Sequence, residues 1–437
     1  MIKLIEAKKQ GRILSQAEIE MWINGAVSGD IPDYQSAALL MAIRLNGMNA
    51  EETGYLTMAM LESGDRIEFP GYSKVIDKHS TGGVGDKVTI ILAPLMAACG
   101  VPVAMLSGRG LGFSGGTIDK FESIIGVNCS FEIQKMQSTL DQIGWTNSMP
   151  TESLVPADRL LYGLRDVTAT VDSIPLITAS IMSKKIAGGA TDLCLDVKCG
   201  PAAFMRSYDQ AEILYQSLKR VGERCHVNVK GLISRMDEPL GCAVGNYIEM
   251  IESVAMLKKK HDTPLMGLVE DLGILMLTMY QPAMSFSQAR ALLTSRIEDG
   301  SALSKLYAYL DICGADDSAI MRLDSIDYTE LSFQTVKAEK SGAISSISGK
   351  QVAEVARDLG AGRKKMTDLI DPNAGVLLRK TVGDSVQSGE DLAYLFGDRI
   401  DPSRIDSARQ AFIIGQDDAD FSGQASQKES ITIAMMD

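Results

Sequence analysis

Two glycine-rich segments contain the residues of this chain that are best suited to chemistry on an anion. The first reads KHSTGGVGDK from residue 78, and the second reads SGRGLGFSGGT from residue 107. Glycine lets the backbone turn tightly and approach a bound group closely, and the N–H groups at the start of a following helix favour anions. The polar side chains that add donors are Lys78, Ser80, Thr89, Ser107 and Thr117. Together the segments predict a site for a small, doubly charged oxyanion.

The common phosphate-binding motifs do not account for both segments. A P-loop requires Gly-Lys-Ser/Thr, but here Asp86-Lys87-Val88 breaks that pattern. A GxGxxG match starts at Gly110, but it leaves the first segment unexplained. A plain structural alternative, two glycine-rich turns on either side of a buried strand, stays open at this point.

A second set of polar residues lies on both sides of these segments. His79 follows Lys78 directly, and Arg165, Ser180 and Lys184 lie in a segment, residues 162–186, that is expected to be helical. Ser180 and Lys184 are four residues apart, so they share one helix face. Each has a plainer interpretation, because a histidine beside a glycine turn can cap backbone and a lysine on a helix can simply face water.

The order of hydrophobic patterns predicts which elements position these residues. Residues 1–66 contain only helical patterns, and Ser15 with Glu18 forms a capping box before an apolar stripe. From about residue 74 the pattern alternates between strands (75–76, 101–106, 192–197, 227–233) and helices (88–99, 208–221, 246–257). Such alternation predicts a mostly parallel sheet, with ligands at the carboxyl ends of the strands where both glycine segments would lie.

Length and composition restrict the class of protein. A chain of 437 residues is too long for one core, so two or three domains are expected. The net charge of −13 argues against nucleic acid or an anionic membrane as the main partner. Seven cysteines without a CxxC pair, together with no visible signal peptide or membrane-length apolar run, predict a reduced, cytoplasmic protein.

KHSTGGVGD at residues 78–86 and SGRGLG at residues 107–112 resemble the signature segments of the thymidine phosphorylase and pyrimidine-nucleoside phosphorylase family, nucleoside phosphorylase class II. Wider relatives include anthranilate phosphoribosyltransferase. The resemblance covers nearly the whole chain. It implies an α/β fold with three parts: a small all-helical domain (1–66 and 157–190), a large α/β phosphate-binding domain with a mostly parallel sheet (72–156 and 191–331), and a C-terminal α+β, hammerhead-like domain (332–437). The active site would be the cleft between the first two.

The resemblance also implies an activity. Members of this family are pentosyltransferases that reversibly convert a pyrimidine (deoxy)ribonucleoside, such as thymidine or uridine, and phosphate into free base and (deoxy)ribose 1-phosphate. The family works in nucleoside salvage as a homodimer, with inorganic phosphate as co-substrate and no organic cofactor. The positions that match its catalytic residues are His79, Arg165 and Lys184. Those that match its base-binding residues are Arg165, Ser180 and Lys184, and those that match its phosphate-binding residues are Lys78, Ser80, Thr89, Ser107 and Thr117.

The chain departs from the family pattern at several positions. Phe113 stands where histidine is usual, and Pro150 stands where glutamine is usual. These departures leave two alternatives open: a related phosphoribosyltransferase, which would need a pyrophosphate and magnesium site, and a catalytically impaired homologue that only binds nucleoside. The Arg165, Ser180 and Lys184 set favours the phosphorylase.

A third departure concerns a metal. Lys87 occupies a position where some bacterial members have a threonine that helps to bind potassium, and the other ligand positions correspond to Leu240, Ala243 and Glu252. We expect the Lys87 ammonium to fill that cation site, to pair with Glu252 and to make potassium unnecessary.

Overall fold

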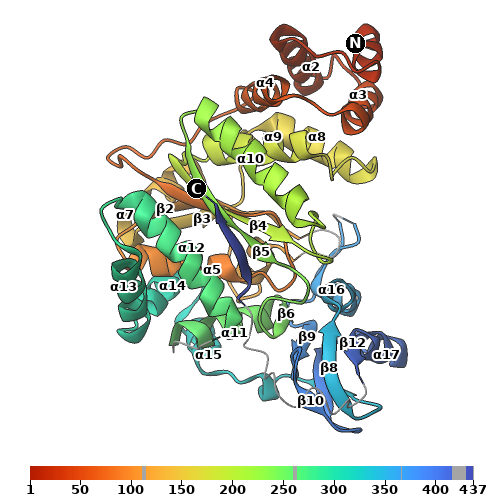
Figure 1. Cartoon of the computed structure of the whole chain (residues 1–437). Coiled ribbons are helices and arrows are strands. Elements are labelled where there is room, and N and C mark those ends of the chain that lie inside the picture. Colours follow the sequence, from red (N-terminus) through yellow and green to blue (C-terminus); the bar gives the residue numbers. More distant parts are fainter. Residues whose placement is uncertain (111–114, 259–262, 366, 416–429, 437) are drawn as a thin grey trace.

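The computed structural model describes residues 1–437 except 111–114, 259–262, 366, 416–429 and 437. A bundle of helices forms one end of the molecule, a large α/β domain the middle and a smaller, strand-rich domain the other end (Figure 1). The bundle comprises α1 (Ile2–Lys9), α2 (Gln16–Ser28), α3 (Asp33–Asn46), α4 (Ala50–Leu61), α8 (Pro156–Val167) and α9 (Ile174–Ala187).

Local sequence explains how the bundle helices begin and why α8 and α9 join them. Ser15 with Glu18 and Asn49 with Glu52 form reciprocal capping boxes at the starts of α2 and α4. The apolar faces of these helices bury side chains such as Trp22, which is fully buried. Helix α8 packs against α2, α3 and α4, and α9 packs against α4, so the segment around residues 156–187 returns to the N-terminal helices.

A six-stranded sheet forms the centre of the α/β domain. Its order is β13 (Thr432–Met436), β5 (Asn228–Arg235), β4 (Asp192–Cys199), β1 (Ile76–Ser80), β2 (Val103–Leu106) and β3 (Trp145–Ser148). The strands from β5 to β3 are parallel, and only β13 pairs antiparallel with its neighbour β5. All eight residues of β4 are buried, as expected for a strand covered on both faces.

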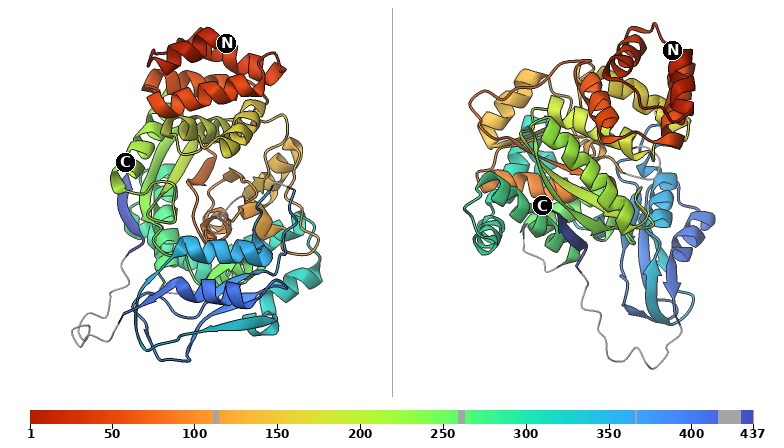
Figure 2. Two further views of the ribbon diagram at one scale, coloured as in Figure 1. Left: turned by 90° about the vertical axis from the view of Figure 1, so that its right-hand side faces the viewer. Right: turned by 45° about the horizontal axis from the view of Figure 1, so that its top comes forward.

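Helices surround this sheet, as the alternating pattern predicts (Figure 2). They are α5 (Val88–Ala98), α6 (Thr117–Phe121), α7 (Ile133–Ile143), α10 (Tyr208–Arg224), α11 (Tyr247–Lys258), α12 (Pro264–Tyr280), α13 (Phe286–Glu298), α14 (Ser301–Ile312) and α15 (Asp317–Ser325). Helix α5, which follows the first glycine segment, is buried along ten of its eleven residues and contacts α11, α12, α13 and α14. The first glycine segment is therefore attached to a helix in the centre of the domain.

The C-terminal domain contains two small antiparallel sheets and two α-helices. The sheets are β10-β8-β12 and β6-β9-β11-β7. The element bounds are β6 (Ala243–Gly245), β7 (Phe333–Lys337), β8 (Gly342–Ile347), α16 (Gly349–Ala356), β9 (Gly375–Leu378), β10 (Ser385–Val386), β11 (Asp391–Phe396), α17 (Pro402–Gln410) and β12 (Phe412–Ile414).

Two strands cross the domain boundary predicted at residues 331 and 332. Strand β6 comes from the α/β part of the chain but pairs with β9 of the C-terminal domain. Strand β13 comes from the C-terminal part but pairs with β5 of the central sheet, beside which it is drawn in dark blue in Figure 1. Residues 432–436, which lie within the range predicted as the C-terminal domain, thus add a strand to the central sheet, and the exchange of strands connects the two domains at two places.

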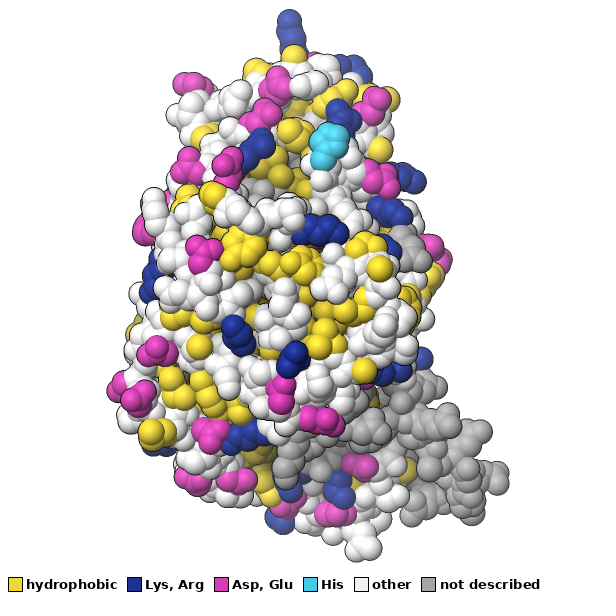
Figure 3. Space-filling model, turned by 90° about the vertical axis from the view of Figure 1, so that its left-hand side faces the viewer, with side chains coloured by type: hydrophobic (Ala, Val, Ile, Leu, Met, Phe, Trp, Pro, Cys, Tyr) yellow, Lys and Arg dark blue, Asp and Glu magenta, His cyan; other side chains and the backbone are white. Residues whose placement is uncertain are grey.

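The surface and the helices add two observations. On the face shown in Figure 3, basic side chains are interspersed with acidic and hydrophobic ones. Within the described ranges, no helix is long and apolar enough to cross a membrane.

Candidate active site

All nine predicted site residues line one pocket of about 300 Å³. The pocket opens at the carboxyl ends of β1 and β2 and is also lined by residues of α8 and α9, so it lies between the sheet and the helical bundle. The nine are Lys78, His79, Ser80, Thr89, Ser107, Thr117, Arg165, Ser180 and Lys184. Residues more than 100 positions apart in the sequence therefore meet at the predicted edge of the sheet.

One wall of the pocket consists of the two glycine segments. Ser80 ends β1, and Thr89 lies in the first turn of α5, at the two ends of the first segment. Ser107 follows β2 directly, and Thr117 begins α6. Gly85 has a φ of +66°, and a Cβ there would lie 2.8 Å from the Leu240 carbonyl oxygen, so only glycine fits this turn. This wall offers hydroxyl and backbone donors to an anion.

A carboxylate that the sequence analysis missed also lines this wall. Burial alone would raise the pKa of Asp86, but the ammonium groups of Lys78, Lys198 and Lys120 outweigh burial and lower its pKa well below its ordinary value. The backbone N–H of Val88 donates to Asp86 Oδ1 at 3.2 Å. Asp86 is therefore a permanent anion on this wall, beside the place predicted for phosphate.

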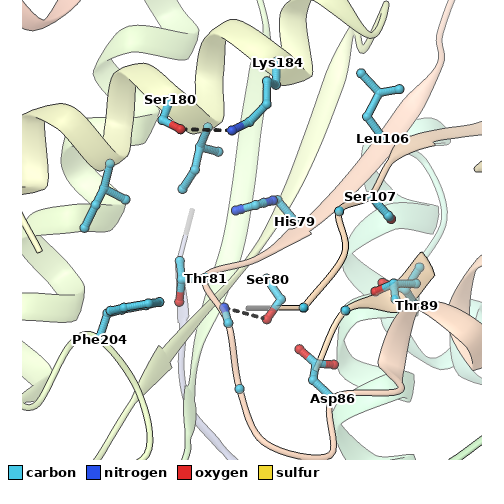
Figure 4. Close-up of a pocket in the computed structure, with 18 of the residues that line it drawn as sticks. His79, Ser80, Thr81, Asp86, Thr89, Leu106, Ser107, Ser180, Lys184 and Phe204 are labelled. Carbon is cyan, nitrogen blue, oxygen red and sulfur yellow. Dashed lines mark hydrogen bonds between the residues drawn. The ribbon is translucent and has the colours of Figure 1, made fainter. Parts of the chain in front are cut away.

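The opposite wall carries the residues predicted to contact a base. Ser180 and Lys184 lie on one face of α9, and Lys184 Nζ donates to Ser180 Oγ at 3.0 Å (Figure 4). Lys184 Nζ also contacts Asp158 Oδ2 at 2.5 Å, and the Asp158 carboxylate is buried on α8. Asp158 thus fixes where the Lys184 ammonium points.

Arg165 is buried beside this pair. Its Nη2 donates to the Val171 carbonyl oxygen at 2.7 Å and its Nη1 to the Leu176 carbonyl oxygen at 3.1 Å. The Tyr162 ring lies 5.8 Å from the Arg165 guanidinium carbon and 5.7 Å from Lys184 Nζ, within the range of cation–π attraction. The two cations are thus held against one aromatic ring.

Asp172 lies close in sequence to Arg165 but pairs with a different arginine. The Asp172 carboxylate forms a two-point ion pair with Arg44 of α3, at 2.7 Å for both bonds. Hydrogen bonds to backbone carbonyls hold Arg165 instead.

His79 lies between the two walls (Figure 4). Burial lowers the pKa of His79 well below its usual value, and the positive charges of Lys185, Lys184 and Lys78 lower it further. The imidazole is therefore neutral at physiological pH, with one N–H to donate. The neutral imidazole can still donate this N–H to an oxygen on which negative charge develops.

A buried ion pair supports the strand that carries His79. Lys185 Nζ contacts Asp77 at 2.8 Å and donates to the Leu106 carbonyl oxygen at 3.2 Å, so it connects the ends of β1 and β2. Burial raises the pKa of Asp77 to about 6, although Lys185 opposes this shift. The pair fixes the relative position of the two strands from which the glycine segments start.

Lys87 points away from the pocket into a small polar cage. Its ammonium is fully buried and contacts the Leu240 carbonyl oxygen at 2.6 Å, the Ala243 carbonyl oxygen at 3.1 Å and Glu252 Oε2 at 2.9 Å. Burial favours the neutral amine, but Glu252 and Glu249 outweigh it and raise the pKa of Lys87. The expected pairing of Lys87 with Glu252 is present.

Two residues of this wall could have been found from sequence. Asp158, Tyr162 and Arg165 are spaced i, i+4 and i+7, which places them on one face of a helix. A carboxylate and an aromatic residue on the face of a predicted catalytic arginine are a signal that the sequence analysis did not use. Phe113, the departure in the second glycine segment, lies outside the described residues.

A pocket between a helical bundle and the carboxyl edge of a parallel sheet, with hydroxyl and backbone donors on one side and two neighbouring cations on the other, is the arrangement of a transferase whose site lies between two domains. Family comparison makes this specific. Residues 2–64 match the glycosyl transferase family helical bundle domain, residues 72–303 match its a/b domain, and residues 343–415 match the pyrimidine nucleoside phosphorylase C-terminal domain. The chain belongs to this glycosyl transferase family, which confirms the family predicted from the two glycine segments.

Individual relatives agree with this assignment. The chain is 43% identical over 393 residues to a pyrimidine-nucleoside phosphorylase of Staphylococcus epidermidis, which covers 90% of each chain. It is 44% identical over 400 residues to that of Staphylococcus haemolyticus, covering 91% of this chain and 92% of the relative. Anthranilate phosphoribosyltransferase from Thermus thermophilus shares the fold, with a TM-score of 0.56 and 18% identity over 71% of this chain and 99% of that one.

Proposed function

We propose that this protein catalyses the reversible phosphorolysis of a pyrimidine nucleoside or deoxynucleoside, such as uridine or thymidine. The observation that carries the proposal is the pocket with two different walls. Hydroxyls and glycine backbone face one side, the Arg165, Ser180 and Lys184 group faces the other, and neutral His79 lies between them. The name of the relatives, pyrimidine-nucleoside phosphorylase, supports the same reaction.

In this proposal each wall has its own task. A phosphate oxygen, held by Lys78, Ser80, Thr89, Ser107 and Thr117, attacks C1′ of the sugar. The bond from C1′ to N1 of the base breaks, and its electron pair leaves with the base. Negative charge then develops on the base, where donors placed in advance are most effective. Arg165 and Lys184 donate to the base carbonyl oxygens, Ser180 bonds N3, and the His79 N–H donates to the O2 oxygen.

Base release tests this proposal. Purified protein is incubated with uridine or thymidine, with and without inorganic phosphate, and free base is measured by chromatography. We expect release only with phosphate, together with formation of pentose 1-phosphate. No release from either nucleoside by folded protein would refute the proposal and favour the nucleoside-binding alternative. Base-dependent consumption of phosphoribosyl pyrophosphate would instead indicate the related phosphoribosyltransferase.

We further propose that the Lys87 ammonium serves as an internal cation and that the enzyme needs neither potassium nor an organic cofactor. Two carbonyl oxygens and one carboxylate around a fully buried charge are the ligand set that a monovalent cation would take. The ammonium supplies the same charge without a binding equilibrium.

A homodimer in the cytoplasm completes the proposal. Helix α3 contacts both α1 and α8, and these three helices expose large apolar side chains, among them Ile2, Tyr34, Leu45 and Val167, each at least 65% exposed. Exposed apolar residues gathered on adjacent helices are typical of subunit interfaces. Light scattering of the purified protein tests the dimer. All seven cysteines are free thiols, which supports a reducing compartment.

A further inference from the structure

Asp119 lies behind the second glycine segment and holds its two described flanks together. Asp119 is 3% exposed on α6, and its Oδ2 accepts a hydrogen bond from the Gly110 N–H at 2.7 Å. Gly116 packs so closely against the other flank that a Cβ would lie 2.1 Å from the Gly110 nitrogen. The flanks that carry Ser107 and Thr117 are thus joined to each other, and the Asp119 carboxylate is one of the side chains that join them.

Arg363 of the C-terminal domain binds the same carboxylate. Its Nη1 donates to Asp119 Oδ2 at 2.8 Å and its Nη2 to Oδ1 at 2.9 Å, although 244 positions separate the two residues. Nη1 also lies 3.4 Å from the Gly110 carbonyl oxygen. Arg363 is only 8% exposed. A buried two-point pair of this kind fixes orientation as well as distance, which a lysine could not do.

The segment that carries Arg363 is itself fixed. Asn246 Nδ2 donates to the Ala361 carbonyl oxygen at 2.8 Å, which connects this segment to the start of α11. Ala361 and Gly362 line a small cavity together with Gly115 of the second glycine segment. The C-terminal domain therefore abuts the glycine segment from behind, on the side away from the substrate pocket.

Arg109 also binds Asp119, but it cannot connect the glycine segment to the C-terminal domain. Its Nη1 lies 3.1 Å from Asp119 Oδ1 and 2.5 Å from Glu122 Oε2, and its side chain is 35% exposed. Arg109 belongs to the glycine segment itself, so this contact cannot anchor the segment to another part of the molecule. Arg363 provides that anchor.

We propose that Arg363 is a positioning residue of the phosphate subsite, through which the C-terminal domain holds Ser107 and Thr117 in the arrangement that binds phosphate. The inference rests on the proposed phosphorolysis and extends it, because it assigns part of the phosphate site to a domain that does not line the phosphate-binding wall. Arg363 acts through Asp119 and touches no substrate.

Steady-state kinetics of three variants test the proposal. Arg363→Met removes the cation and keeps most of the side-chain volume. Arg363→Lys keeps the charge but loses the two-point bond. Arg409→Met is the matched control, because Arg409 pairs with Glu339 and Asp406 inside the C-terminal domain and does not reach the glycine segment.

We expect the KM for phosphate to rise on the order of 10- to 100-fold in Arg363→Met, because small displacements of binding groups have effects of this size. The KM for uridine should change less than about twofold, since the opposite wall is untouched. Arg363→Lys should fall between Arg363→Met and the parent, and Arg409→Met should match the parent. Calorimetric titration with inorganic phosphate alone should give the same order of affinities.

Two results would overturn the proposal. One is a phosphate KM and phosphate affinity in Arg363→Lys and Arg363→Met that stay within twofold of the parent. The other is an equal loss for phosphate and uridine in the variants. If Arg363→Met does not fold, Arg363→Lys decides. If the unmodified protein releases no base but binds phosphate, the proposed phosphorolysis is refuted, and calorimetry of the variants still decides the role of Arg363. If the unmodified protein does not bind phosphate, the proposed phosphorolysis and the proposed role of Arg363 are both refuted.

Discussion

Replacing Lys87 by threonine should convert an internal cation into a potassium site. The substitution removes the ammonium but leaves the carbonyl oxygens of Leu240 and Ala243 and the Glu252 carboxylate around the space. Glu252 is only 7% exposed. The substitution would therefore leave a largely buried carboxylate without the Lys87 ammonium that pairs with it. Removing one partner of a buried ion pair costs about 3–5 kcal/mol. In a domain of this size 1 kcal/mol corresponds to about 2–4 °C, so the melting temperature should fall by roughly 6–20 °C.

Potassium should reverse much of that loss. A cation at 100 times its dissociation constant stabilises the folded state by about 2.7 kcal/mol, which is most of the lower estimate of the loss and about half of the upper estimate. The assay is thermal unfolding, followed by circular dichroism, in potassium chloride and in tetramethylammonium chloride at equal ionic strength. The large organic cation provides the same screening but does not fit a cage of three oxygens.

Lys8 provides a matched control. Lys8 Nζ contacts Glu52 Oε1 at 2.6 Å, and both side chains are almost fully buried in the helical bundle. Lys8→Thr should destabilise the protein by a similar amount, with no recovery specific to potassium, since within the described residues the Lys8 ammonium bonds only to Glu52, whereas the Lys87 ammonium also bonds two backbone carbonyl oxygens. Equal responses of the two variants to potassium would refute the reasoning. Potassium-dependent activity of the unmodified protein would refute it as well.

Three further predictions follow from the pocket and the sheet. Asp158→Asn weakens the hold on Lys184, so the KM for uridine should rise on the order of 10-fold while the KM for phosphate stays within twofold; a change confined to phosphate would contradict this. His79 should remain neutral at pH 6, which proton NMR can show with His79→Gln for assignment. Because the pKa of His79 is lowered in the folded state, the free energy of unfolding should decrease as the pH falls below about 6.5. A titration midpoint of His79 near pH 6.5 in the folded protein would contradict the lowered pKa. Deleting residues 430–437 removes β13 and exposes the edge of β5, so the melting temperature should fall by several degrees; an unchanged value would show that β13 contributes little.

The local pattern of polar and apolar residues correctly predicted two kinds of element: helices whose capping residues lie next to them in sequence, and strands that are buried along their whole length. The predicted capping box of Ser15 and Glu18 starts a helix as expected. The apolar stretches predicted as strands at 101–106, 192–197 and 227–233 are β2, β4 and β5 within a few residues. Long apolar runs in a parallel sheet depend little on which neighbour covers them, so the sequence alone identifies them.

Elements that depend on distant partners could not be predicted in this way. Strand β3 has the mixed sequence WTNS, yet all four of its residues are buried. Part of this burial comes from α14, since the ring centroids of Trp145 and Tyr309 lie 4.1 Å apart. Strand β13 joins β5 across roughly 200 residues of chain. In the site, the face shared by Ser180 and Lys184 follows from helix geometry, but the contact of Lys184 with Asp158 depends on how α8 packs beside α9.

The balance of buried charge explains how an acidic chain builds a site for an anion. Most buried lysines around the pocket have a carboxylate partner at contact distance: Lys87 with Glu252, Lys120 with Glu249, Lys185 with Asp77 and Lys198 with Asp196. Buried ion pairs add little net stability, since the cost of desolvation offsets the attraction between the two charges. They are favourable only when the two groups lie at the right distance and orientation. Their effect is therefore to fix the strand ends and glycine segments rather than to create a large positive field. In the proposed reaction, phosphate recognition would then depend mainly on the placement of hydroxyl and backbone donors. The proposal for Arg363 and Asp119 extends this argument, since it makes that placement depend on an ion pair that does not touch the substrate.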